Sequence, residues 1–314
     1  MIVVTGGAGF IGSNLIRGLN EKGLNNIMVV DNLSRSEKHL NLNSLKIVDY
    51  IDKEDFLLKL GSFKHVKTIF HQGACSNTTE TDGTYMMKNN FEYSKTLLNF
   101  SLENGADFLY ASSASVYGNG DKGFREEPEC EYPLNIYAFS KYMFDNYVRR
   151  IFKNHKPKSQ ILGLRYFNVY GFQENHKGPM ASVAFHFFKQ LQAGSSIKLF
   201  KGSENFVRDF VFVKDAVDVN LFAYEKKISG ILNCGTGNER SFYDIGAIFK
   251  ELEPSVEIEF IPFPDHLKGK YQTFTKADLT NLRKSGYTKD FHTLEEGISL
   301  YYTCLKETGG FIVN

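Results

Sequence analysis

Short apolar runs alternate with longer amphipathic segments through the first half of the chain. The runs predict buried strands at 2–4, 27–30, 45–48, 68–71, 108–112 and 161–166. Between them, apolar residues recur every three or four positions, which predicts helices from residue 10 and over 52–60, 83–103 and 135–152. Strands and helices in this order predict an α/β fold built on a doubly wound parallel sheet with helices on both faces.

The first strand leads into a glycine-rich turn and then a helix. Gly6, Gly9 and Gly12 are spaced so that a helix N-terminus with free backbone N–H groups can hold a diphosphate. Asp31 ends the next strand, where an acid can accept hydrogen bonds from an adenosine ribose. This context favours a Rossmann-like dinucleotide site, although the spacing differs from the usual G-x-G-x-x-G. The alternative is a structural turn followed by an incidental acid.

After residue 171 the pattern becomes less regular. It predicts helices at 182–193, 214–224, 243–252, 276–284 and 293–305, and strands at 197–200, 208–213, 231–234 and 257–261. We expect a dinucleotide-binding domain of residues 1–170 plus about 207–236. A smaller, interleaved α/β substrate-binding domain is expected over about 171–206 plus 237–314. We expect the tail, 309–314, to be loosely held.

Polar or glycine-rich clusters follow the predicted strands at their carboxyl ends. They lie at 6–12, 31, 71–76, 112–113 and 167–171. Ligands of open parallel sheets bind beyond this edge. The convergence of the clusters therefore predicts a single active site there.

A tyrosine and a lysine four residues apart share a face early in the predicted helix 135–152. An ammonium such as that of Lys141 favours the phenolate of a neighbouring Tyr137, which lowers the pKa of the phenol toward a value useful for a base. Ser113 ends a strand on the same edge and can hydrogen-bond a substrate hydroxyl. The three residues predict hydride chemistry on an alcohol or ketone with a nicotinamide cofactor. The alternative is a core tyrosine with a solvated lysine.

Composition excludes several other classes of function. The net charge of +1 gives no electrostatic basis for binding nucleic acid or a membrane surface. No apolar run approaches the length of a membrane span, and the N-terminus does not resemble a signal peptide, so we expect a cytoplasmic protein. The four cysteines lack metal-ligand spacing, so we expect free thiols and no metal site.

The chain resembles the extended short-chain dehydrogenase/reductases that act on nucleotide sugars. The matching strings are TGGAGFIG at 5–12, SSASVYG at 112–118, Tyr137-x-x-x-Lys141, RYFNVYG at 165–171 and RDFVFV at 208–213. Further strings in register are similar to those of the ADP-heptose epimerases within this family. They are VDNL at 30–33, ACSNTTE at 74–80, KGPMASVAFH at 177–186, FKGSENF at 200–206 and PFPDHLKGKY at 262–271.

The resemblance implies an enzyme that inverts one side-chain carbon of an ADP-bound heptose, on the route to the inner core of lipopolysaccharide. It implies NADP as cofactor, one tightly bound per subunit and recycled at each turnover, and we expect a homo-oligomer. Residues matched to the cofactor, besides the glycines, are Phe10, Ile11, Asp31, Asn32, Lys38, Lys53, Gln72, Gly73, Ala74, Cys75, Ser76, Asn89, Lys141 and Val169. Residues matched to the substrate are Ser113, Asn168, Pro179, His186, Phe200, Lys201, Gly202, Ser203, Arg208 and Tyr271. Position 179 departs from the expected serine.

The local sequence leaves the choice between NAD and NADP open. Asp31 favours the free ribose of NAD and repels a 2′-phosphate. Lys38 and Lys53 can pair with that phosphate, or they can be solvated surface lysines. Only the resemblance favours NADP.

Two other assignments keep alternatives at this point. Arg208 can grip a substrate diphosphate in a bidentate manner, or form a salt bridge with Asp209 or Asp215. His186 can contact substrate or be a core histidine.

Inversion at a side-chain carbon implies a second proton carrier. A half-turn about one bond exposes the other face of the ketone to a fixed nicotinamide, and it carries the oxygen away from Tyr137. Lys177, in the loop 174–178, is our candidate for the second acid/base, and His176 is its rival.

The alternative functions are a nucleotide-sugar 4-epimerase, a sugar dehydratase, or a non-catalytic cofactor-binding protein. An acid that a dehydratase needs is missing at 112–114.

Overall fold

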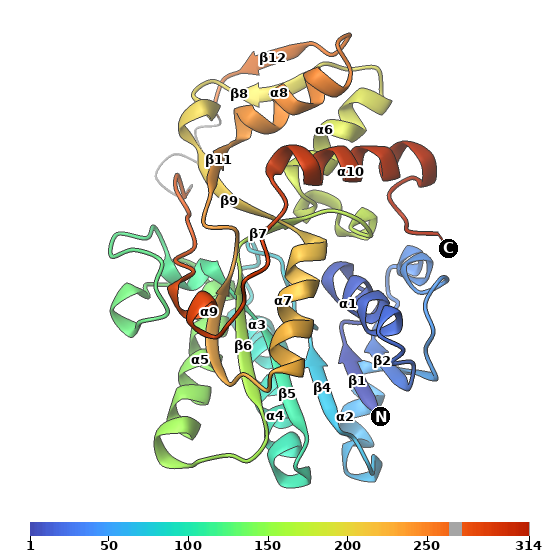
Figure 1. Cartoon of the computed structure of the whole chain (residues 1–314), viewed down its shortest axis with the longest axis vertical. Coiled ribbons are helices and arrows are strands. Elements are labelled where there is room, and N and C mark those ends of the chain that lie inside the picture. The colour runs from blue at the N-terminus through green and yellow to red at the C-terminus, as the bar shows by residue number, and fades with distance from the viewer. Residues whose placement is uncertain (264–271, 314) are drawn as a thin grey trace.

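A seven-stranded parallel sheet forms the centre of the computed structural model, which describes residues 1–263 and 272–313. The strand order is β10-β6-β5-β4-β1-β2-β3 (Figure 1). The strands are β1 (Ile2–Thr5), β2 (Ile27–Asp31), β3 (Asp49–Asp52), β4 (Thr68–His71), β5 (Asp107–Ser113), β6 (Ile161–Tyr166) and β10 (Gly230–Cys234). The predicted parallel sheet is therefore confirmed.

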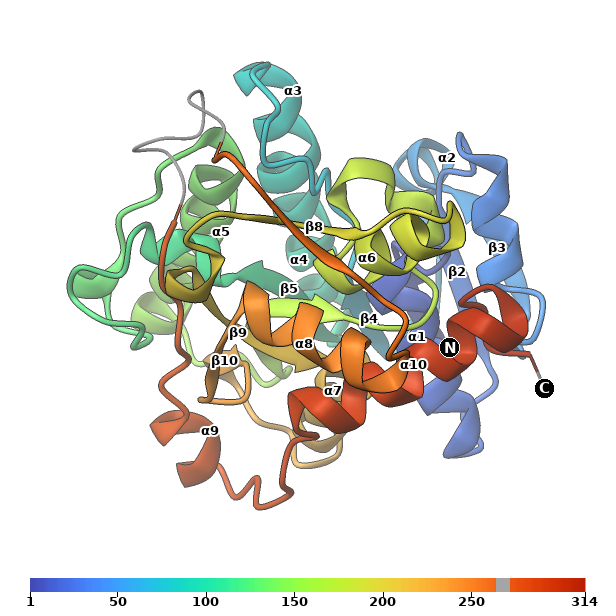
Figure 2. The ribbon, with the colours of Figure 1, turned by 90° about the horizontal axis from the view of Figure 1, so that it is seen from above.

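Helices cover both faces of this sheet, because alternate residues of each strand point to opposite sides. Val4 packs with α1 (Phe10–Glu21) and α7 (Val213–Glu225) in one core. Its neighbour Val3 belongs to a second core with α2 (Lys53–Leu58), α4 (Tyr93–Asn104) and α5 (Ile136–Asn154). Figure 2 shows the two helical layers on either side of the sheet. The doubly wound architecture follows from fully buried strands such as β1 and β4.

A second group of elements lies beyond the carboxyl edge of the sheet (Figure 1). Two small sheets belong to it: β7 (Asn168–Tyr170), β9 (Val207–Phe212) and β11 (Glu239–Ser241) in one, β8 (Ile197–Phe200) and β12 (Ile258–Ile261) in the other. Three helices, α6 (Val183–Gln192), α8 (Phe242–Leu252) and α10 (Leu294–Thr308), enclose a third core with residues such as Phe188 and Phe249. Two further short helices are α3 (Gly83–Met87) and α9 (Thr280–Lys284).

Several predicted elements differ from the observed ones. The strand expected at 45–48 is shifted to β3, because Leu45 and Ile47 pack against the core from an irregular segment and the polar residues after them pair with β2. The helix expected at 83–103 is broken by a π-helical turn, Lys88–Glu92. The helix expected at 276–284 begins only at Thr280.

The C-terminal tail is held more firmly than we expected. The carbonyl of Ile312 accepts hydrogen bonds from Arg17 at 3.1 Å and Ser44 at 2.9 Å. The carbonyl of Gly310 accepts one from the backbone N–H of Gln173 at 2.8 Å. Within the described residues the tail therefore packs against the start of the chain. Among those residues, no helix combines the length and the apolar content that crossing a bilayer requires.

Candidate active site

The glycine turn brings two backbone segments closer than side chains allow. Gly6 has a φ of +66°, and a Cβ there would lie 2.6 Å from the Cα of Gly73. A Cβ on Gly12 would lie 2.1 Å from the carbonyl oxygen of Gly6. The N-cap of α1 is Gly9, which supplies no side-chain hydrogen bond within the described structure, so the first N–H groups of this helix are available to an anion. The turn fits the diphosphate of a dinucleotide.

A buried side-chain amide beside this turn is also consistent with a site for a bound dinucleotide. Gln72 follows β4, and its Oε1 accepts a hydrogen bond from the hydroxyl of Tyr166 at 3.1 Å. Its Nε2 is buried and has no hydrogen-bond partner among the described residues. Because a buried N–H without a partner is costly, the amide points to a group that the structure does not contain.

The acid at the end of β2 is paired with one of the two predicted lysines. Asp31 accepts hydrogen bonds from the backbone N–H groups of Ala8 at 2.9 Å and Asn32 at 2.7 Å. The ammonium of Lys38 forms an ion pair with the same carboxylate and donates to the carbonyl of Asn32 at 2.8 Å. The charge of Asp31 is therefore compensated within the protein.

The π-helical turn orients two consecutive asparagines to different parts of the site. Asn89 accepts a hydrogen bond from Lys53 at 2.7 Å. Asn90 is buried and bonds both backbone groups of Cys75, accepting from its N–H at 2.8 Å and donating to its carbonyl at 2.9 Å. Sequence reasoning missed Asn90, whose role depends on the extra residue in this turn. Ala74 and Ser76, in the loop that Asn90 fixes, are exposed.

The serine, tyrosine and lysine lie together where β5 ends and α5 begins. Ser113 forms a hydrogen bond with Tyr137, and this bond opposes the burial that raises the pKa of the phenol. Lys141 donates to the carbonyl of Ala111 at 2.8 Å, and burial lowers its pKa to about 8. Burial thus raises the pKa of Tyr137, against our expectation of a lowered one, and Lys141, which is directed to the backbone of β5, does not offset this effect.

The second predicted proton carrier lies in the turn η6 (Asn175–Met180). The ammonium of Lys177 lies 4.9 Å from the ring centroid of Phe10, and burial lowers its pKa. His176 is directed instead to Asn41, with 3.3 Å between its Nδ1 and the amide nitrogen. Burial and the nearby Lys38 and Lys177 lower the pKa of His176 to about 4, so it stays neutral at physiological pH.

A cavity of about 390 Å³ brings Lys177 together with three other predicted residues. Asn168 and Val169 enter it from β7, and Arg208 enters it from β9. Ser113 is paired in register with Tyr166, two residues before Asn168, so the cavity adjoins the end of β5. The dimensions suit a sugar nucleotide fragment.

Arg208 keeps its guanidinium at this cavity by contacts with the backbone. It donates to the carbonyl of Val207 at 2.9 Å and to the carbonyl of Gln272. Both carboxylates that we considered as its partners are engaged elsewhere. Asp209 accepts hydrogen bonds from the backbone N–H groups of residues 236, 237 and 277, and Asp215 lies 2.7 Å from Nδ1 of His292.

The remaining predicted substrate residues lie on neighbouring segments. His186 is half-buried on α6, 3.4 Å from the carbonyl of Pro179, so it is not a core histidine. Phe200 ends β8, and Lys201 and Gly202 lead into a turn where the buried hydroxyl of Ser203 has no partner among the described residues. Tyr271 lies outside the described residues. All four cysteines are free, and Cys130 and Cys234 are buried.

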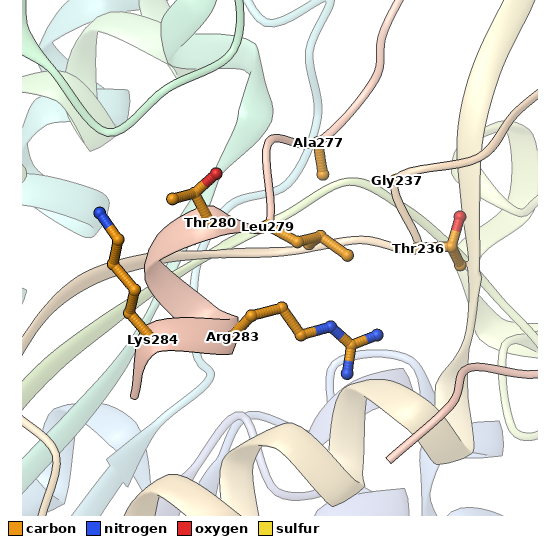
Figure 3. A pocket seen from close by; sticks show the side chains of 7 residues that line it. All are labelled: Thr236, Gly237, Ala277, Leu279, Thr280, Arg283 and Lys284. Carbon is orange, nitrogen blue, oxygen red and sulfur yellow. The ribbon is translucent and has the colours of Figure 1, made fainter. Parts of the chain in front are cut away.

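A second cavity, of about 670 Å³, contains none of the predicted site residues. Thr236, Gly237, Ala277, Leu279, Thr280, Arg283 and Lys284 line it (Figure 3). Its arginine, Arg283, donates to the carbonyls of Tyr287 at 3.0 Å and Lys289 at 2.8 Å. Because this cavity contains none of the predicted site residues and the smaller one contains Asn168, Val169, Lys177 and Arg208, we assign the active site to the cavity that Lys177 lines.

Comparisons with known proteins show which family and which enzymes this chain resembles. A model of the NAD dependent epimerase/dehydratase family matches residues 2–235. The ADP-L-glycero-D-manno-heptose-6-epimerase of Brachyspira hyodysenteriae is 57% identical over 318 residues, with full coverage of both chains. The crystal structure of the Helicobacter pylori ADP-L-glycero-D-manno-heptose-6-epimerase is 31% identical, with a TM-score of 0.84, over 98% of this chain and 96% of that one. A UDP-glucose 4-epimerase from Thermotoga maritima is 30% identical, with a TM-score of 0.83, over 98% and 99%.

Proposed function

This chain belongs to the NAD dependent epimerase/dehydratase family, and on that premise we propose that it interconverts ADP-D-glycero- and ADP-L-glycero-D-manno-heptose. The reaction inverts C6″, a carbon of the sugar side chain, so the enzyme is an isomerase. Similarity to two heptose epimerases over nearly the whole length of the chain supports this substrate. In this proposal residues 1–170 and about 207–236 hold the cofactor, and residues 171–206 and 237–314 hold the sugar nucleotide.

One observation carries the proposal: two separate ionisable side chains, Tyr137 and Lys177, border the carboxyl edge of the sheet. Tyr137 is hydrogen-bonded to Ser113 at the end of β5. Lys177 lines the cavity beside β7 and contacts the ring of Phe10, the first residue of α1. A side-chain epimerase needs two such groups, because the substrate oxygen changes its position when the ketone turns over.

The residues divide the chemistry as follows. A nicotinamide cofactor, when bound beside the glycine turn, would supply the reversible hydride chemistry that a transient oxidation at C6″ needs. Tyr137 exchanges a proton with the substrate oxygen in one orientation, and Lys177 does so after the half-turn. Ser113 hydrogen-bonds that oxygen, and Arg208 holds the substrate diphosphate. Each orientation of the oxygen needs its own proton donor, since an unprotonated alkoxide is costly in a protein site.

We assign NADP as the cofactor, one tightly bound per subunit. The ion pair between Lys38 and Asp31 supports this assignment, because it compensates the carboxylate that would repel a 2′-phosphate. Lys53, on the neighbouring α2, brings a second positive charge to the same side of the sheet. In this proposal the enzyme is a cytoplasmic homo-oligomer that supplies ADP-heptose for the inner core of lipopolysaccharide.

The test combines cofactor identification with stereochemistry. Acid release should yield NADP from protein purified without added cofactor, and ADP-heptose should then reach an equilibrium of its C6″ epimers. Lys177→Met should lower turnover about 10²-fold or more in both directions, as expected for loss of a general acid/base. Normal turnover in this variant together with loss in His176→Ala would transfer the role to His176. Turnover of UDP-glucose without turnover of ADP-heptose would establish a 4-epimerase, and turnover of neither would indicate a non-catalytic protein.

A further inference from the structure

A fully buried carboxylate lies directly behind the lysine of the active site. Glu174 precedes the turn η6 and has no solvent exposure. Its Oε2 lies 3.9 Å from the ammonium of Lys177, whose side chain is 22% exposed and lines the cavity. The backbone reinforces this arrangement, because the N–H of Lys177 donates to the carbonyl of Glu174 at 2.9 Å.

Three donors fix the position of this carboxylate. Ser182, the N-cap of α6, donates its backbone N–H at 2.6 Å and its hydroxyl at 2.5 Å. Tyr301, from the middle of α10, donates its hydroxyl at 3.0 Å. Burial and the adjacent carboxylate raise the pKa of Tyr301, so its hydroxyl remains a donor. Hydrogen bonds of this kind stabilise an ionised carboxylate. These donors therefore hold the carboxyl group of Glu174 at a defined place.

We infer that Glu174 is a positioning residue for Lys177. The carboxylate of Glu174 holds the ammonium of Lys177 at the cavity wall and sets how readily this ammonium gives up its proton. This inference rests on the proposed function, in which Lys177 carries the second proton. Glu174 does not line the cavity, so it acts through the lysine and not on the substrate.

Among the charged groups around Lys177, Glu174 is the acid that offsets the effect of burial on the pKa of the lysine. Burial lowers the pKa of the ammonium, and Glu174 raises it. On the other side of η6, His176 is neutral, and the cations of Arg35 and Lys38 lie beyond it. The aromatic face of Phe10 contacts the ammonium, and the cation of Arg208 lines the same cavity. Without the carboxylate, these surroundings favour the neutral amine.

Glu174→Gln removes the charge and can keep the contacts. A glutamine whose oxygen takes the place of Oε2 still accepts from the backbone N–H of Ser182. Its NH₂ group then replaces Oε1 and donates to the hydroxyls of Ser182 and Tyr301, which can accept. The substitution therefore tests the charge with little change in packing.

The first readout is the titration of Lys177 itself, because its side chain is partly exposed. Competitive acetylation with acetic anhydride over a range of pH, followed by peptide mass spectrometry, gives the pKa of Lys177 in the holoenzyme. Glu174→Gln should lower it by about 1–3 units, the range for losing an opposite charge at this distance. Glu307→Gln, an exposed acid on α10, is the matched control and should leave it unchanged. An unchanged pKa of Lys177 in Glu174→Gln overturns the inference.

The second readout is the pH profile of kcat/KM. Because burial lowers the pKa of Lys177 and raises that of Tyr137, we assign the acid limb to the lysine within the proposed function. Glu174→Gln should therefore move the acid limb to lower pH. Both directions must show the same displacement, because the equilibrium between the epimers does not depend on pH. The pKa of Lys141, about 8, should be the same in Glu174→Gln as in the wild type, because Glu174 is not among the groups that shift it.

Turnover separates the inference from the proposed function. In Glu174→Gln, kcat should fall about 10- to 100-fold from loss of positioning while KM changes less than about threefold. If Glu174→Gln has the lysine pKa and the kinetics of the wild type while Lys177→Met is inactive, the role of Glu174 is refuted and the proposed function stays intact. Normal turnover in Lys177→Met would instead refute the function of the lysine. If Glu174→Gln does not fold, Glu174→Asp replaces it in the experiment. The shorter side chain moves the carboxylate away from Lys177, so the pKa of Lys177 should fall by a smaller amount. An unchanged pKa of Lys177 in this variant would contradict the inference.

Discussion

Replacing Lys38 tests how the protein distinguishes its cofactors. Lys38 forms an ion pair with Asp31 and donates to the carbonyl of Asn32, so its ammonium lies at the end of β2, where a dinucleotide presents its adenosine ribose. In Lys38→Met, Asp31 keeps its hydrogen bonds from the N–H groups of Ala8 and Asn32. The fold around the carboxylate should therefore survive, while the compensating charge is lost.

The magnitude follows from the bond that is removed. A hydrogen bond to a charged group contributes about 1.5–3 kcal/mol. At about 1.4 kcal/mol for each factor of ten, the Kd of NADP should rise about 10- to 150-fold. The Kd of NAD should change less than about threefold, because its ribose hydroxyls donate to the same carboxylate. Repulsion between the unpaired Asp31 and the 2′-phosphate adds to the selectivity.

The assay is isothermal titration of protein stripped of its cofactor, with NADP and NAD measured in parallel. The exposed Lys46→Met is the matched control on the same connection. Lys53→Met should show a loss of the same kind. Equal weakening of both cofactors in Lys38→Met would show a structural effect, and no change in either would refute the assignment of Lys38 to the 2′-phosphate.

Further predictions concern catalysis and stability. Tyr137→Phe should lower turnover about 10²- to 10⁴-fold with little change in cofactor affinity, and near-normal turnover would show that another residue is the base. Arg165→Met should lower the free energy of unfolding by about 3–5 kcal/mol in urea titrations, because Arg165 is fully buried against Asp145 at 2.8 Å and Glu131 at 2.5 Å. The pKa of Glu131 is lowered from its ordinary value of 4.5 by Arg149 and Arg165. Glu131 therefore stabilises the fold above pH 4.5, and this contribution is lost as the pH falls through the pKa of the folded state. The stability difference between wild type and Glu131→Gln should therefore shrink on acidification, and a constant difference would contradict this.

The central strands could be predicted from the sequence because they are buried on both faces. In β1, β2, β4 and β6 every residue is buried, which produces the continuous apolar runs. The edge strand β3 has the polar sequence DYID, so its position depends on pairing with β2 and not on its own composition. Strands of three residues such as β7 and β11 likewise depend on their partners, β9 above all.

The positions of Asp31 and Ser113 at the carboxyl edge of the sheet could be predicted, because each ends a strand. Asn90 escaped prediction because a one-residue insertion in a helix is invisible to hydrophobic periodicity. Glu174 escaped it because an acid in a polar loop resembles a surface residue. Its burial depends on Tyr301, which is 127 residues away in sequence.

Turnover in deuterated water tests the central claim most directly. If the configuration of C6″ changes by transient oxidation, the hydrogen that leaves the carbon returns to it without mixing with solvent. Mass spectrometry and NMR of epimerised ADP-heptose should then show no deuterium at C6″ after many turnovers. Deuterium at that carbon would indicate removal of a proton to form a carbanion, and would contradict the redox mechanism assigned to this site.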